Sequence, residues 1–483
     1  MITVNIGRTF LRAYNQKYEK ELTAKEFFDQ EYFELFFNHP KYLQWAGNSE
    51  FVQGIRTMQN GKLGIQYRGV DNNIMKFESK EKADEFVRHT VWDNMIDVEI
   101  KKEKKKSVYF LVKTLSIDER KNLLNKFSIK VDKCLDQNNI DSSMAIGFPA
   151  SEVDDFGQYS GLVTDIPINP NLDEILYSWI GSSLSIGVSG GFSILFNQPE
   201  ILLQTYEGWK VYREFLNNPS LNRLAGNKIT SWNGQWLSYS FSKNRRPDFD
   251  YATFDQLGFF KNSNTETVIE TVKWSKLFFN LSNQFSQNTF IGYVFSLGEK
   301  NKTLGFYPFK FEQAQKLIKL YVKLFGVNTA INEAPIYEEI FGLKFYKACQ
   351  FGAIGIQALR PEQLVQDIQN ENKINLIKFR TYKIWLLAMI NKEETLRLTN
   401  EISEILHLYK DGSKGTDRKA LVEKKLLQSG KRNFLIHWEE IVIALPEKKI
   451  MLKEISDKVF YMETEEFGYF IALLKLDYRY QEK

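Results

Sequence analysis

The stretch Ser185 to Phe196 (SIGVSGGFSILF) places an apolar run on each side of Gly190-Gly191. Two apolar runs separated by a glycine pair predict a tight β-hairpin, because glycine readily adopts the positive φ that such turns need. Farther along, Trp236 to Phe241 alternates apolar and polar residues after the turn signal Asn233-Gly234, which predicts a further strand. We therefore expect residues 134–310 to form a β-rich region with long loops.

The preceding residues, 1–133, are predicted to form a mixed α/β region. Thr23 to Glu26 has the pattern of a capping box, and the aromatic residues that follow have helical spacing. We expect a second amphipathic helix over 79–95 and two strands over 96–101 and 107–114. The run Lys101 to Lys106 joins these strands, and because an uninterrupted charge run stays out of a core, it predicts a basic hairpin tip.

After residue 310 the apolar spacing changes to the helical period of 3.6. We expect helices over 312–325, 335–350, 361–370, 374–389, 393–409, 417–429 and 463–476. Residues 311–483 are therefore predicted to be helical and to end in a bundle over about 370–483. Together the three regions indicate the α+β class.

The composition excludes several classes of protein. The 483 residues are 43% hydrophobic and 26% charged, which is outside the disordered, collagen-like and disulfide-rich classes. The two cysteines, Cys134 and Cys349, lie far apart, which is typical of a reducing compartment. Because no stretch reaches the ~18 apolar residues of a membrane span, we expect a cytoplasmic protein with no membrane partner.

The net charge of +4 conceals segregated blocks. Residues 134–209 contain ten acids and neither lysine nor arginine, whereas residues 215–247 contain no acid. Basic residues interleaved with aromatic ones suit a nucleic-acid groove, because cations neutralise phosphates and bases stack on rings. The candidate contact residues in the second block are Lys228, Asn233, Gln235, Lys243, Asn244, Arg245 and Arg246.

Asparagine and glutamine can bind adenine through two hydrogen bonds, and arginine can do the same with guanine, so the two loops of this block have the side chains needed to read a short duplex motif. The alternative is a surface strand with solvated ends and core tryptophans. Two further basic segments are candidates for phosphate contacts, although both can equally be solvated faces. Their residues are Lys101, Lys102, Lys104, Lys105 and Lys106 in the hairpin, and Lys424, Lys425, Lys431 and Arg432 near the C-terminus.

No catalytic motif stands out. None of the four histidines lies at metal-ligand spacing, and Gly187 to Gly191 lacks the lysine of a phosphate-binding loop, so we expect no metal, no cofactor and no catalytic residue. Fragments of a nuclease-like set occur at Asp248, Asp250 and Glu99, but in reversed order and with arbitrary spacing. An orphan nuclease or hydrolase, and a protein-only scaffold, remain the alternatives to a nucleic-acid-binding protein.

Two segments carry a family resemblance: Phe27 to Trp45 (FFDQEYFELFFNHPKYLQW) and Phe345 to Pro361 (FYKACQFGAIGIQALRP). Both look like parts of the large subunits of type I CRISPR Cascade complexes, the family counted eighth among the Cas proteins. The resemblance implies a non-catalytic subunit for antiviral defence that recognises the protospacer-adjacent motif in duplex DNA and contacts the 5′ handle of the CRISPR RNA. It also implies that the subunit guides the displaced strand, binds other Cascade subunits and helps to recruit the helicase-nuclease.

The resemblance implies a role for each set of candidate residues. Asn233, Gln235 and the segment Lys243 to Arg246 would read or wedge the adjacent motif. The hairpin tip would hold phosphates of the duplex or of the RNA handle, and the C-terminal cations would follow the displaced strand. Guide pairing would then read the long sequence while protein reads only the short motif.

Overall fold

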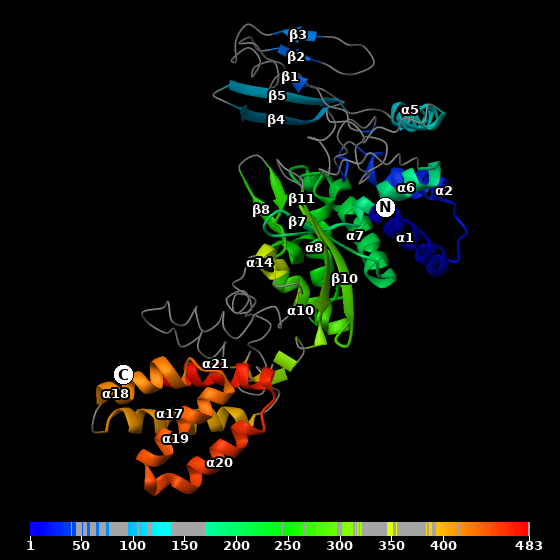
Figure 1. Ribbon diagram of the computed structural model, residues 1–483. Helices are drawn as coiled ribbons and strands as arrows, with labels where there is room; N and C mark the ends of the chain where they lie inside the picture. Colours follow the sequence, from blue (N-terminus) through cyan, green and yellow to red (C-terminus); the bar gives the residue numbers. More distant parts are fainter. Residues whose placement is uncertain are drawn as a thin grey trace. The chain divides into compact units, whose positions relative to one another are not determined.

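The computed structural model describes most of the chain (Figure 1). The described residues are 1–39, 41–44, 51, 56–57, 64–66, 74–76, 95–103, 106–113, 117–136, 170–243, 245–263, 266–296, 302–312, 345–350, 354, 393–412 and 415–481, with a few single positions between 314 and 388. They divide into two compact units. The first unit contains residues 1–240, 244–272 and 292–306, and the second contains 241–243, 273–291 and 307–483.

Helix α1 (Ile2–Tyr18) of the first unit packs closely on α6 (Leu172–Ser183). Glycine permits this approach, because a Cβ atom at Gly181 would lie 1.9 Å from the carbonyl oxygen of Thr3. The predicted capping box is confirmed: Thr23 accepts a hydrogen bond from the Glu26 amide, and Glu26 accepts one from Thr23. It starts a continuous helical segment made of α2 (Ala24–Phe27), the π-helical turn η1 (Phe28–Tyr32) and α3 (Phe33–Phe36).

Aromatic side chains fill the core of this unit. Tyr32 stacks on Phe36 with ring centroids 4.3 Å apart, and Phe36 meets Trp209 edge to face at 4.8 Å. Helix α5 (Ile117–Asp136) adds Phe127, which contacts Trp179 at 5.3 Å. Each such ring pair adds roughly 0.5–1.5 kcal/mol beyond its burial, so these contacts hold distant segments together.

The hairpin predicted from Gly190-Gly191 is confirmed. Strand β6 (Ile186–Val188) pairs antiparallel with β7 (Phe192–Phe196), and both glycines have positive φ. Strands β10 (Thr289–Ser296) and β11 (Lys302–Lys310) extend this sheet in the order β11-β10-β7-β6. A separate hairpin joins β8 (Phe260–Asn262) to β9 (Thr267–Ile269).

The middle of the chain contains more helix than the sequence predicts. Besides α6 it forms α7 (Pro199–Asn217), the turn η3 (Pro219–Leu221), α8 (Ile229–Ser240), α9 (Tyr251–Gln256) and α10 (Trp274–Gln284). The predicted strand over Trp236 to Phe241 is wrong, because most of it belongs to α8. A small antiparallel sheet combined with helices on both sides in sequence still confirms the α+β class.

The N-terminal hairpin is also confirmed. Strand β4 (Met95–Glu103) pairs antiparallel with β5 (Lys106–Lys113), and Glu103 is opposite Lys106 at the tip. A three-stranded sheet precedes it, made of β1 (Arg56–Thr57), β2 (Gly64–Gln66) and β3 (Ile74–Lys76). The helix predicted over 79–95 lies almost entirely outside the described residues.

The helices predicted over 393–409, 417–429 and 463–476 in the second unit are confirmed. They correspond to α17 (Glu394–Lys410), to α18 (Gly415–Ala420) with the π-helical η5 (Leu421–Leu426), and to α21 (Thr464–Gln481). The unit also contains α14 (Phe345–Gln350), and two helices that were not predicted, α19 (Lys431–Ala444) and α20 (Lys449–Phe460), joined by the turn η6 (Pro446–Lys448). The buried faces of α17, η5, α19, α20 and α21 share one core, so the chain ends in a helical bundle (Figure 1).

Candidate nucleic-acid interface

Asn233 lies in the core of the first unit and not in a loop, which corrects the sequence prediction. It belongs to α8, its side chain is fully buried, and its amide nitrogen donates to the carbonyl oxygens of Ser183 and Ser185, both at 2.8 Å. Its side-chain oxygen accepts from the indole nitrogen of Trp209 at 3.1 Å. All of these partners are protein groups, so Asn233 has no free edge with which to read a base.

Gln235 is buried in the same helix and needs the same correction. Its side chain is 4% exposed, and its amide nitrogen donates to the carbonyl oxygen of Glu270 at 2.8 Å. The neighbouring Trp232 and Trp236 stack at 6.2 Å and donate to backbone carbonyls of α7. The tryptophans of this block therefore form protein core, as the alternative interpretation of the sequence held.

The basic turn that follows α8 is exposed. Lys243, Arg245 and Arg246 all lie at the surface, and in the described part of the chain their side chains make no hydrogen bond and no ion pair. Asn244 lies outside the described residues. Lys228, just before α8, is half-buried, and its carbonyl oxygen accepts from the Trp232 amide.

Tyr239 fixes the backbone of this turn. Its hydroxyl donates to the carbonyl oxygen of Arg246 at 3.0 Å and accepts from the amide of the same residue at 3.1 Å. Tyr239 is itself buried and meets Phe254 edge to face at 4.9 Å. The guanidinium of Arg246 thus extends into solvent from a backbone that is held on the core.

One of the two acidic residues near the turn accepts hydrogen bonds from within the protein. Asp250 accepts hydrogen bonds from the amide and the hydroxyl of Thr253, at 2.8 and 2.9 Å, and these bonds lower the pKa of its carboxyl. It therefore caps α9 and is not paired with an arginine. Asp248 is the other exposed acid of the turn.

The hairpin candidates lie where the sequence places them. Lys101 and Lys102 are at the end of β4, opposite Val108 and Ser107, and Lys106 begins β5. Lys104 and Lys105 lie outside the described residues. The backbone confirms a hairpin that carries Lys101, Lys102 and Lys106 near its tip.

The C-terminal candidates divide into two kinds. Lys424 and Lys425 on η5, and Arg432 on α19, are exposed, and their side chains have no hydrogen bond or ion pair within the described chain. Lys431 instead donates to the carbonyl oxygen of Met462 at 2.6 Å, and its ammonium lies 5.9 Å from the Phe460 ring centroid. Lys431 therefore joins α19 to the end of α20.

Other cations that sequence reasoning did not single out are paired with acids. Lys17 donates to Glu207 at 3.0 Å, and Lys210 and Tyr18 also contact that carboxylate. Lys20 donates to Glu31 at 2.8 Å. Burial alone would raise the pKa of Glu31, but the bonds from Lys20 and the tyrosines outweigh burial and lower it. These lysines are already neutralised by the protein.

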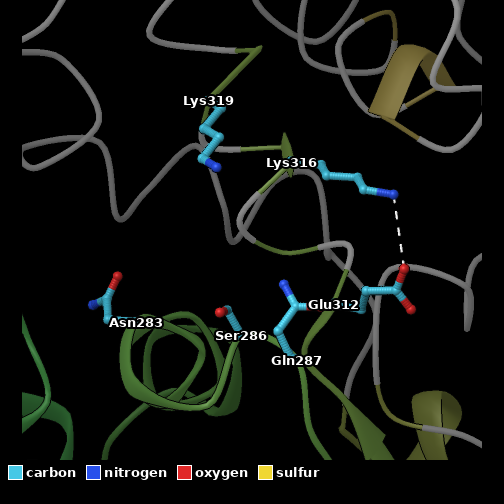
Figure 2. Close-up of a pocket in the computed structure, with 6 residues that line it drawn as sticks. All are labelled: Asn283, Ser286, Gln287, Glu312, Lys316 and Lys319. Carbon is cyan, nitrogen blue, oxygen red and sulfur yellow. Dashed lines mark ion pairs between the residues drawn. The ribbon is translucent and has the colours of Figure 1, made fainter.

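The described part of the second unit also contains a polar pocket of about 380 Å³, which no sequence motif predicts. It is lined by Asn283 in the last turn of α10, by Ser286 and Gln287 after that helix, and by Glu312, Lys316 and Lys319. Figure 2 shows Lys316 turned toward Glu312, with the ammonium 3.7 Å from the carboxylate, while Lys319 extends over the pocket. Within the described residues no three His, Cys, Asp or Glu side chains are grouped to hold a metal ion.

Comparison of the chain with protein-family models, with curated proteins and with solved structures finds no match. None of the helices in the described part of the chain has the length and apolar character needed to cross a membrane.

Proposed function

We propose that this chain binds nucleic acid through exposed cations that no carboxylate of the described chain neutralises. One observation carries the proposal: Arg245 and Arg246 are exposed on a turn whose backbone is bound to the buried Tyr239, and among the described residues neither side chain has a partner. Phosphates that bind such cations release condensed counterions, which favours association. The paired lysines around Glu207 and Glu31 offer no comparable gain, because they would first have to leave their carboxylates.

A fixed turn suits a specific contact. Arginine can bind a phosphate or the O6 and N7 edge of guanine through two parallel hydrogen bonds, and less entropy is lost when its backbone is already ordered. Lys243, at the start of the same turn, adds a third cation. With Asn233 and Gln235 excluded by burial, any reading of a short duplex motif would rest on Arg245 and Arg246.

The C-terminal bundle offers a weaker second surface. Residues 393–481 contain 15 basic and 16 acidic side chains, so the bundle has no general attraction for phosphates. Locally, Lys424, Lys425 and Arg432 are exposed and have no ion-pair partner among the residues that the structure describes. The acid of the same segment, Glu423, accepts from Tyr478 at 3.2 Å and pairs with Lys419 at 3.7 Å. We infer that these three cations contact a displaced single strand.

The finer proposal is a non-catalytic large subunit of an RNA-guided CRISPR effector complex. Its support is the resemblance of Phe27 to Trp45 and Phe345 to Pro361 to that family, together with the basic hairpin, the basic turn and the helical C-terminus. In such a complex the hairpin lysines Lys101, Lys102 and Lys106 would contact the guide RNA handle or the duplex, and the helicase-nuclease would dock on the assembled complex. The first resembling segment supplies buried aromatic residues such as Phe28 and Tyr32, so it informs the fold more than the contacts.

Two measurements test nucleic-acid binding and the role in an effector complex separately. For nucleic-acid binding, the full chain is titrated with a 30-base-pair duplex at several salt concentrations. The proposal expects log K to fall linearly with log salt, and binding that is absent at 50 mM salt would refute it. For the finer role, the chain is co-expressed with the other proteins encoded beside its gene. Copurification with a discrete short RNA is expected, and the recovery of a protein-only complex would refute the effector role.

A further inference from the structure

Three aromatic rings lie together on neighbouring strands of the sheet in the first unit. Tyr293 and Phe295 are on β10 and stack with centroids 5.7 Å apart, and Phe306 is on β11, 5.3 Å from Tyr293. The two strands run side by side (Figure 1). Tyr293 and Phe295 are half-buried against the core, whereas Phe306 is 64% exposed. The exposed ring of Phe306 therefore packs against the half-buried ring of Tyr293.

The backbone of β11 has an unusual conformation directly before Phe306. Gly305, directly before Phe306, has φ of +112°, a conformation that a residue with a side chain rarely adopts. The Phe306 ring is tilted by 52° to Tyr293, so the two rings do not cover each other's faces. Tyr293 is held in place by a hydrogen bond of 3.0 Å between its hydroxyl and that of Thr303.

The sequence of the segment that carries Tyr293, Phe295 and Phe306 is basic, which favours a polyanion as ligand. Residues 289–311 contain the lysines Lys300, Lys302 and Lys310 against a single acid, Glu299. An aromatic face in a locally basic segment is the combination on which bases of single-stranded nucleic acid stack while phosphates meet cations.

The same strand is poorly suited to an added peptide strand. Strand β11 ends the sheet, and beyond it Ile354 bridges to Phe309, which leaves residues 302–307 as the outer edge in the described part of the chain. An extended peptide would need a regular ladder there, and the positive φ of Gly305 interrupts the extended conformation in the middle of it.

We propose that Tyr293, Phe295 and Phe306 form a stacking platform for a base of single-stranded nucleic acid. This inference rests on the proposed nucleic-acid-binding function and adds a base contact to it. Phe306 would stack on the base, and the two inner rings would support it.

The test compares two labelled 15-mers of equal charge, oligo-dT and an abasic oligomer, by fluorescence anisotropy with the full chain. We expect Phe306→Leu, which keeps an apolar side chain but removes the ring, to lower the affinity for oligo-dT about 10-fold and to leave the abasic oligomer unchanged. Phe306→Trp should retain the affinity. Ile291→Ala is the matched control, because Ile291 is 54% exposed on β10 and carries no ring on which a base could stack.

The outcomes separate this inference from the proposed function. An unchanged affinity of Phe306→Leu for oligo-dT, or an equal loss for both oligomers, would overturn the stacking platform while nucleic-acid binding stands. A wild-type chain that binds the 30-base-pair duplex but neither oligomer would overturn the platform alone, and one that binds none of the three would refute both proposals.

Discussion

The indole nitrogen of Trp209 donates a hydrogen bond to the side-chain oxygen of Asn233 across 3.1 Å of buried space. This bond joins α7 to α8, and the amide nitrogen of Asn233 adds bonds to Ser183 and Ser185 at the end of α6 and the entry to β6. One asparagine thus satisfies polar groups from three segments. Asn233 therefore holds the first unit together and is not a nucleic-acid contact.

Asn233→Ala should lower the free energy of unfolding by about 3 kcal/mol, because it leaves two buried carbonyls and one indole nitrogen without their partner. Urea denaturation measures this change. The folded variant should bind duplex DNA with wild-type affinity. Wild-type stability combined with a loss of DNA affinity would restore a base-reading role for this residue.

Gly234→Ala should destabilise the protein even though alanine is the better helix former. A Cβ atom at this position would lie 2.5 Å from the carbonyl oxygen of Gly187 and 2.6 Å from the Val272 side chain, so the helix would have to move off the sheet. We expect a loss of about 3 kcal/mol by urea denaturation. Gly430→Ala is the control, because a Cβ atom there meets nothing within 4 Å, and its cost should stay below about 1 kcal/mol.

The buried Asp477 forms an ion pair with the half-buried Lys383 in the second unit, at 2.7 Å, and Thr399 donates to the same carboxylate at 2.7 Å. Asp477→Leu should lower the free energy of unfolding by about 3 kcal/mol, because it leaves the Lys383 ammonium without its counter-charge. The double variant Asp477→Leu/Lys383→Met should be more stable than the single one. A double variant less stable than Asp477→Leu would show that the pair does not act as a unit.

His39 should make stability depend on pH. Burial, followed by the positive charge of Arg213, lowers its pKa from 6.5 to about 4, while its ring nitrogen Nδ1 accepts from the Lys41 amide at 2.9 Å. Between these values the unfolded chain binds the proton more readily, so stability is complete above about pH 6.5 and falls as the pH approaches 4. His39→Asn, which can accept the same hydrogen bond, should flatten this dependence in urea denaturation from pH 4.5 to 7.5. Identical slopes for the two proteins would contradict the account.

Elements with a local chemical signal were predictable from the sequence. The capping box at Thr23 and Glu26, the Gly190-Gly191 hairpin and the hairpin around Lys101 to Lys106 each depend on residues close in the chain. The helix α7 carried readable signals as well, namely Pro199 in its first turn and buried residues at helical spacing such as Ile201, Tyr206 and Trp209. The prediction of a β-rich region with long loops over 134–310 does not take these signals into account.

Helix α8 could not be recognised by its periodicity. Every residue from Trp232 to Ser240 is buried, so the helix shows no polar face. The alternation of apolar and polar residues that suggests a strand there is a coincidence of composition. The residues of the candidate site likewise divide into those whose environment the local sequence predicts and those whose environment depends on distant residues. Exposure of Arg245 and Arg246 follows from their charge, whereas the burial of Asn233 and Gln235 depends on Trp209 and Glu270, which are distant in sequence. The rings of Tyr293 and Phe306 meet only through the pairing of β10 and β11, and no local pattern predicts that.

The central claim is that free cations, and not total charge, bind nucleic acid. The most direct measurement is the salt dependence of duplex affinity for Arg245→Ala/Arg246→Ala beside the control Lys25→Ala/Arg397→Ala. The control removes two exposed cations that pair with Asp29 at 2.7 Å and with Glu401 at 3.6 Å. We predict that the slope of log K against log salt becomes shallower by about 2 in the arginine variant and stays at the wild-type value in the control. Equal slopes in all three proteins would contradict the account.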